Sequence, residues 1–70
     1  MTACPRCEGQ GRLLKATIVA TREDVIVCDE CEALWVGPKV ESGNFVDLMT
    51  YLRSIRIDNG WSALDVHGEL

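Results

Sequence analysis

The hydrophobic pattern of the chain changes near Pro38. Before that position, apolar and β-branched residues gather in three short runs, at residues 13–21, 24–27 and 33–36. Short runs of this composition, bounded by glycine, proline and charged residues, are typical of β-strands. We therefore expect three antiparallel strands, with Arg22 and Glu23 in the first turn and Gly37-Pro38 after the third strand.

After Pro38 the apolar positions recur at spacings of three and four residues, at Phe45, Leu48, Met49, Leu52 and Ile55. This period predicts an amphipathic helix, which we place at about residues 44–55. Ser42 or Asn44 is suited to cap its N-terminus, and Asp47 falls in the first turn, where the helix dipole favours an acid. We expect the apolar stripe to pack on the sheet against Trp35 and the valines. A groove for a partner is the alternative role of this stripe.

The tail, residues 57–70, allows two structures after the turn that Asp58-Asn59-Gly60 predicts. Ser62, followed three residues later by Asp65, resembles a capping box and favours a short helix. That helix would carry its larger side chains on one face, at Trp61, Leu64 and His67. The alternative is a hairpin that turns at Asn59-Gly60 and pairs residues 55–57 with 63–66.

Seventy residues suffice for one small domain, in which a hydrophobic core supplies only about 3–5 kcal/mol of stability. Residues 1–12 contain no apolar segment of the kind found in secretion signals. The longest nearly apolar run, residues 16–20, is too short to span a membrane. We therefore expect a cytoplasmic protein without a membrane segment. Its fold needs a stabilising cross-link in addition to its core.

The four cysteines of the chain can provide this cross-link, because they form a C-x2-C-x20-C-x2-C pattern. Two such knuckles joined by a hairpin can place four thiolates around one tetrahedral metal. In a reducing compartment this pattern indicates one structural Zn²⁺, and two disulfides or a redox-active dithiol are the alternatives. A zinc site of this kind contributes roughly 10–16 kcal/mol of apparent binding free energy to folding. The predicted ligands are Cys4, Cys7, Cys28 and Cys31.

The same pattern argues against catalysis. Four thiolates leave the zinc no open position for a water molecule, so a closed site is structural. Neither C-x2-C pair precedes a helical pattern, which disfavours a thiol redox enzyme. His67, the only histidine, has no nucleophile or carboxylate partner that the sequence identifies. We therefore expect a protein that is not an enzyme.

The charge of the chain is −4, divided as +1 over residues 1–27 and −5 over residues 28–70. Acids also surround the second knuckle, at Asp29, Glu30 and Glu32, where we expect them to be solvated. Binding of nucleic acid depends largely on neutralising phosphates, so this acidity disfavours it. Were it to occur, the basic residues of the first hairpin would carry it: Arg6, Arg12, Lys15 and Arg22.

These motifs together resemble the small bacterial zinc ribbons of the transcription-factor-IIB zinc-binding type, over about residues 3–50. The segments that carry the resemblance are Cys4-Pro5-Arg6-Cys7, Leu13-Leu14, Val27-Cys28-Asp29-Glu30-Cys31 and Leu34-Trp35-Val36. The chain departs from the family at Glu8 and Glu32, which stand where a glycine commonly follows each knuckle, and residues 51–70 have no counterpart. Residues 4–11 are also similar, more weakly, to one cysteine-glycine repeat of DnaJ-type chaperones. The resemblance implies a ribbon fold with four zinc ligands and little about activity.

The sequence as a whole predicts a small, metal-stabilised α+β domain. Residues 1–38 would form a zinc ribbon of three antiparallel strands, residues 39–56 a linker and helix, and residues 57–70 the tail. We expect a protein–protein interaction module, such as an adaptor, an accessory subunit or an immunity-type inhibitor. Its partner surface would comprise the helix from Phe45 to Ile55 and the region of Trp61. The alternatives are a transcription-related nucleic-acid-binding ribbon and, after it, a thiol redox enzyme.

Overall fold

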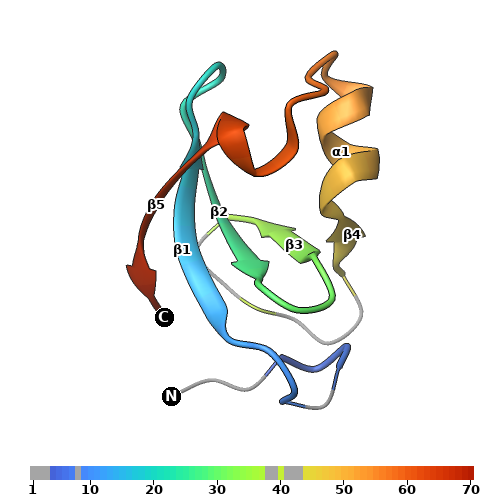
Figure 1. The fold of residues 1–70 in the computed structure, drawn as a ribbon, viewed down its shortest axis with the longest axis vertical. Coiled ribbons are helices and arrows are strands. Elements are labelled where there is room, and N and C mark those ends of the chain that lie inside the picture. Colours follow the sequence, from blue (N-terminus) through green and yellow to red (C-terminus); the bar gives the residue numbers. More distant parts are fainter. Residues whose placement is uncertain (1–3, 8, 38–39, 41–43) are drawn as a thin grey trace.

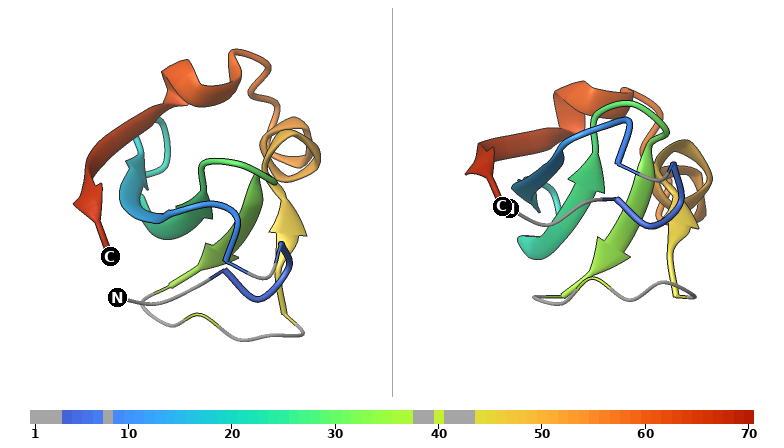
Figure 2. Two further views of the ribbon diagram at one scale, coloured as in Figure 1. Left: turned by 60° about the horizontal axis from the view of Figure 1, so that its bottom comes forward. Right: turned by 90° about the horizontal axis from the view of Figure 1, so that it is seen from below.

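The computed structural model describes residues 4–7, 9–37, 40 and 44–70. Its main feature is a five-stranded antiparallel sheet in the order β4-β3-β2-β1-β5 (Figure 1). One short helix, α1, stands beside β4 at one edge of the sheet, and β5 forms the other edge (Figure 2). The elements in chain order are β1 (Leu13–Ile18), β2 (Glu23–Cys28), β3 (Ala33–Val36), β4 (Val46–Asp47), α1 (Leu48–Ser54), the 3-10 helix η1 (Gly60–Ala63) and β5 (Leu64–Glu69).

The hairpin of β1 and β2 is the centre of the sheet, and its register runs from Leu13 opposite Cys28 to Ile18 opposite Glu23. The three strands expected before Pro38 are present. The first was predicted three residues too long, because residues 19–21 lie in the turn, where Val19 is 59% exposed. Glu23, expected in the turn, begins β2. Pro38, expected to follow the third strand, lies outside the described residues.

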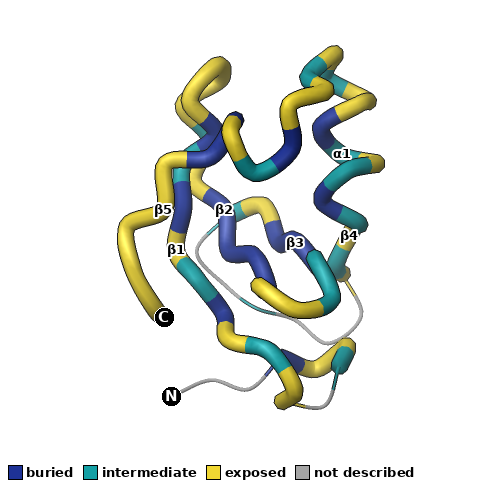
Figure 3. Tube along the Cα trace, viewed as in Figure 1, coloured by how far each residue is buried: buried dark blue, intermediate teal, exposed yellow. Residues whose placement is uncertain are grey.

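The two faces of the sheet carry separate apolar clusters, because side chains alternate along each strand. One face packs against α1 and η1 and contains Leu34 with Leu48 and Leu52 of the helix. The opposite face contains Trp35 together with cysteines of both knuckles. Leu48, Leu52 and Ile55 of the predicted stripe therefore pack on the sheet with its valines, as expected. Phe45 was wrongly placed in this stripe, because it precedes the helix and packs against Trp35 on the other face. The buried residues concentrate in β2 and β3, whereas β5 is mostly exposed (Figure 3).

The helix begins later than predicted. Residues 46–47 pair with β3, with Val46 opposite Leu34, so they form a strand rather than the first helical turn. Asp47 is extended and caps the helix, since its carboxylate accepts from the Thr50 N–H at 3.2 Å. Asn44, one of the two expected caps, precedes this strand, and the other, Ser42, lies outside the described residues. The predicted boundary was therefore wrong because a tertiary strand pairing replaced the first helical turn.

The tail differs from both structures that the sequence allowed. Residues 60–63 form η1 rather than an α-helix, and β5 pairs with β1, not with residues 55–57. Leu64 lies opposite Ile18 and Val66 opposite Ala16, so the tail adds a fifth strand at the free edge of the hairpin. Among the described residues, no helix has the length and apolarity needed to cross a membrane.

Candidate metal centre

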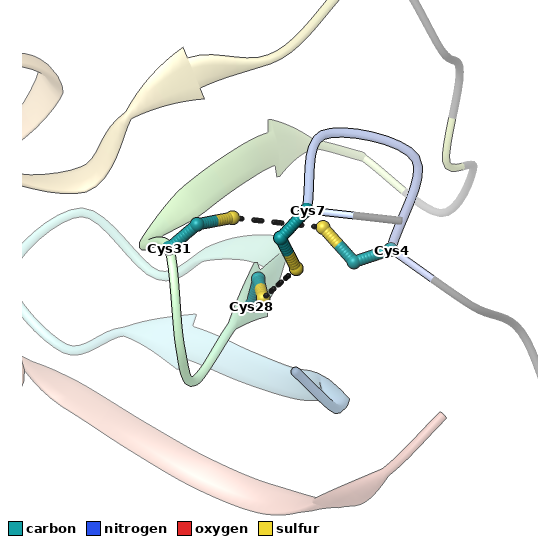
Figure 4. A group of neighbouring side chains, drawn as sticks. All are labelled: Cys4, Cys7, Cys28 and Cys31. Carbon is teal, nitrogen blue, oxygen red and sulfur yellow. Dashed lines mark hydrogen bonds between the residues drawn. The ribbon is translucent and has the colours of Figure 1, made fainter. Parts of the chain in front are cut away.

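The four cysteines converge at one end of the β1–β2 hairpin (Figure 4). Cys4 and Cys7 belong to the turn before β1, Cys28 ends β2, and Cys31 lies in the turn before β3. The sulfur atoms of Cys4 and Cys31 are 3.6 Å apart, as are those of Cys7 and Cys28. All four are free thiols, and all four sulfurs lie within 4.8 Å of one another. The structure thus brings together every residue predicted as a ligand.

This spacing suits a tetrahedral metal. A zinc ion bound by four sulfurs at about 2.3 Å requires sulfur–sulfur separations of roughly 3.8 Å. The two 3.6 Å pairs are close to that value. Thiolates are also the donors that zinc and other soft metals prefer. The donor set and the geometry therefore both fit a metal ion, and they are consistent with zinc.

The backbone of the first knuckle turns tightly around the cysteine sulfurs. The Gly9 N–H donates to the Cys4 carbonyl at 3.0 Å, with Gly9 at a φ of 85° that favours glycine. The Gly11 N–H donates to Cys7 Sγ at 3.3 Å. Position 11 has no room for a side chain, because an ideal Cβ on Gly11 would lie 2.5 Å from Cys28 Sγ.

Arg6, between the first two cysteines, fastens the first knuckle to the rest of the fold. Its guanidinium lies 5.1 Å from the centre of the Phe45 ring, at the distance of a cation–π contact. The same group donates to the Cys31 carbonyl at 3.3 Å and lies 3.9 Å from a carboxylate oxygen of Asp47. Phe45 in turn packs edge-on against Trp35, with ring centres 6.0 Å apart. Arg6 therefore joins both knuckles to the segment that leads into α1.

Two of the acids around the second knuckle make structural hydrogen bonds. Asp29 and Glu30 are exposed, as expected, whereas Glu32 is half-buried. Asp29 Oδ1 accepts from the Arg12 N–H at 2.8 Å, and the Asp29 N–H donates to the Arg12 carbonyl. Glu32 accepts from the indole N–H of Trp61 at 2.9 Å, so Trp61 is half-buried and tied to the second knuckle. Glu30 alone is exposed without such a contact to a described residue.

The thiols differ in acidity before any metal binds. Burial raises the pKa of Cys28, and burial together with the neighbouring sulfurs raises that of Cys31 to about 12. Burial also acts to raise the pKa of Cys7, but the Gly11 N–H and the adjacent sulfurs outweigh it and lower the value to about 7. Cys28 and Cys31 therefore carry protons at neutral pH, and a metal that binds them as thiolates must displace those protons.

Metal affinity should consequently fall as the solution is acidified. At pH 6–8 the metal-free Cys28 and Cys31 are protonated, because their pKa values lie above the ordinary value of 9.0, whereas the bound form holds thiolates. Release of at least these two protons corresponds to a loss of at least roughly a hundredfold in apparent affinity per unit of pH lowered, and the loss steepens below pH 7, where Cys7 is protonated too. Competition with a chromophoric chelator at several pH values measures this slope. An affinity that is independent of pH would contradict it.

Arg6, Arg12 and Arg22 of the first hairpin do not form a single patch. Arg6 lies beside Asp47, and Arg12 lies 3.4 Å from Glu69. Arg22 is in the β1–β2 turn, at the end of the hairpin opposite the cysteines (Figure 1).

His67 lies on β5 and has a partner that the sequence did not identify, because it depends on pairing of β5 with β1. Its Nε2 is 2.7 Å from the hydroxyl of Thr17, which donates to Asp24 at 3.0 Å. The three side chains link β5, β1 and β2 across the sheet.

Fold and site together define a small α+β domain with a five-stranded antiparallel sheet, one α-helix and four clustered cysteines suited to a metal ion. Comparison of the chain with protein-family models, with curated proteins and with solved structures finds no match.

Proposed function

We propose that the chain is a zinc ribbon in which one structural Zn²⁺ is held by four thiolates. The observation that carries this proposal is the approach of four sulfurs to within 4.8 Å of one another at the end of a hairpin. The sequence resemblance to ribbons of the transcription-factor-IIB zinc-binding type supports it, since that resemblance implies the same four ligands. Four protein ligands complete the coordination of zinc, so the metal has a structural role.

Native mass spectrometry of the protein purified under reducing conditions tests the metal assignment. We expect one zinc per chain, and its removal by acid should leave four thiols that an alkylating reagent can modify. A metal-free chain with the mass of two disulfides would contradict the proposal. Zinc at well under one equivalent, with unchanged folding, would contradict it as well.

We further propose that the zinc supports a protein–protein interaction module rather than an enzyme. The apolar side of α1 packs into the core, where Leu48 and Leu52 are buried. A partner would therefore meet the exposed side of α1 and the nearby region of Trp61. Exposed valines elsewhere, at 41–59%, offer further apolar contact area: Val19, Val36, Val46 and Val66.

Size-exclusion chromatography of a native extract that contains the tagged protein tests this function. We expect the zinc-loaded chain to elute in a complex, and substitution of exposed residues of α1 to release it. Elution as the free domain under all growth conditions would contradict the interaction role. Binding to nucleic acid, the second candidate, gains no support from the distribution of the basic residues or from the charge of −4.

A further inference from the structure

Three exposed arginines, Arg22, Arg53 and Arg56, form no ion pair within the described part of the chain. They lie at the end of the long axis opposite the cysteines, in the β1–β2 turn, the last turn of α1 and the loop after it (Figure 1). The two arginines beside the metal site, by contrast, each lie next to a carboxylate. These three arginines, unlike Arg6 and Arg12, are therefore available to a partner at the end of the molecule away from the cysteines.

The position of Arg56 is unusual for a large side chain. Helix α1 ends with the Ile57 N–H bonded to the Leu52 carbonyl at 2.8 Å and the Arg56 N–H bonded to the Arg53 carbonyl at 3.0 Å. This is the Schellman pattern, whose left-handed residue is most often glycine. Arg56 occupies that residue with a φ of 64°. The helix dipole accounts for Arg53 in the last turn, but glycine would end the helix more favourably than Arg56 does.

Arg53 and Arg56 border a shallow hollow of about 240 Å³, together with Ile57 and Asp58. Two guanidinium groups and one carboxylate give this site a net charge of +1, and the half-buried Ile57 adds apolar surface. Guanidinium groups bind carboxylates through two parallel hydrogen bonds. We propose that this hollow, the Arg53–Arg56 site, docks an acidic segment of a partner protein that carries an apolar side chain beside its carboxylates.

An acidic protein segment fits this charge distribution better than a nucleic acid does. The chain carries −4, and four thiolates with one Zn²⁺ would add −2 at the metal end. An extended polyanion would be repelled by most of the surface, whereas a short acidic segment contacts only the Arg53–Arg56 site. The inference rests on the proposed interaction role, since it names the chemistry of the partner.

The test uses the zinc-loaded protein and a short fluorescent peptide rich in glutamate with one leucine, followed by fluorescence anisotropy and by amide chemical shifts. We expect shifts centred on residues 53–58 and binding that weakens as salt is added. Arg53→Gln and Arg56→Gly should together weaken binding by about tenfold. Arg56→Gly alone should also raise the thermal midpoint by roughly 2–6 °C, because glycine suits the left-handed position.

Arg12→Gln is the matched control, because it removes one positive charge at the metal end, where Arg12 lies beside Glu69. We expect it to leave peptide binding unchanged. The proposal is overturned if Arg56→Gly binds the peptide as well as the wild type does, or if Arg12→Gln weakens binding equally. Tighter binding of a single-stranded oligonucleotide that the same two substitutions abolish would assign the site to phosphates instead. A native partner that is retained by the Arg53 and Arg56 variants would remove this inference and preserve the proposed interaction role.

Discussion

Replacing Cys28 with serine is expected to abolish zinc binding and leave the chain unfolded at room temperature. Cys28 is completely buried and is the last residue of β2, so its sulfur would join the central hairpin to the proposed zinc. A structural zinc site contributes roughly 10–16 kcal/mol, whereas a core of this size supplies only about 3–5 kcal/mol. Loss of one of four ligands should therefore remove more stability than the core can replace. Far-UV circular dichroism and the zinc content of the purified variant measure both effects.

Glu30→Ser is the matched control for this experiment. It introduces serine two residues away, in the turn that follows Cys28, at an exposed side chain. That variant should bind one zinc and remain folded. Chelation of zinc from the wild type should give the same unfolded spectrum as Cys28→Ser, and readdition of zinc should reverse it. A Cys28→Ser protein that stays folded without metal would show that the core alone stabilises the domain and would contradict a structural role for the zinc.

The parts of the fold that could be predicted are those whose contacts are local in sequence. The β1–β2 hairpin follows from two adjacent apolar runs, and its closure brings Cys28 beside the first knuckle without further assumptions. The spacing of the cysteines likewise predicts which four residues compose the site. The apolar period of residues 45–55 correctly identified the face of α1 that packs on the sheet, because Leu48 and Leu52 are both buried, but it wrongly included Phe45, which packs on the other face.

The errors arise where distant segments compete with local preference. Val46 and Asp47 satisfy the helical period, but pairing with β3 makes them a strand and turns Asp47 into the helix cap. The tail contains the alternation of a strand at Leu64 and Val66, yet the turn at Asn59-Gly60 favours a local hairpin. The actual partner of β5 is β1, nearly fifty residues earlier in the chain, and no local pattern specifies that pairing.

The contacts that support the metal site were also beyond local prediction. Arg6 lies over Phe45 and donates to the Cys31 carbonyl, so one side chain of the first knuckle meets two later segments. Trp61 reaches Glu32 from η1. Each contact depends on the assembled sheet, whereas the cysteine pattern required only a hairpin. The clustering of the four cysteines was therefore easier to predict than the residues that hold them in place.

Gly11 provides the sharpest test of how closely the two knuckles approach. An alanine Cβ at this position would lie 2.5 Å from Cys28 Sγ and 2.6 Å from Glu30 Cβ. Both separations are too short for non-bonded atoms, so the backbone would have to move. Such movement would disturb the Gly11 N–H bond to Cys7 Sγ and the position of the Cys28 sulfur. We expect Gly11→Ala to destabilise the domain by about 1–3 kcal/mol and to weaken zinc binding by about 10–100-fold. Thermal denaturation and competition with a chelator measure the two effects.

Gly37→Ala is a suitable comparison because it isolates the cost of backbone conformation from that of crowding. Gly37 has a φ of 108° and no atom within 4 Å of an added Cβ, so alanine there is strained without a steric clash. Because zinc binding is coupled to folding, Gly37→Ala should lose apparent zinc affinity only in proportion to its loss of stability, by about tenfold for each 1.4 kcal/mol. Gly11→Ala should lose more affinity than its loss of stability accounts for, because its strain lies at the metal site. If it instead binds zinc with unchanged affinity, the close contact between the first knuckle and Cys28 does not control the geometry of the site, and the ligands adapt independently of that packing.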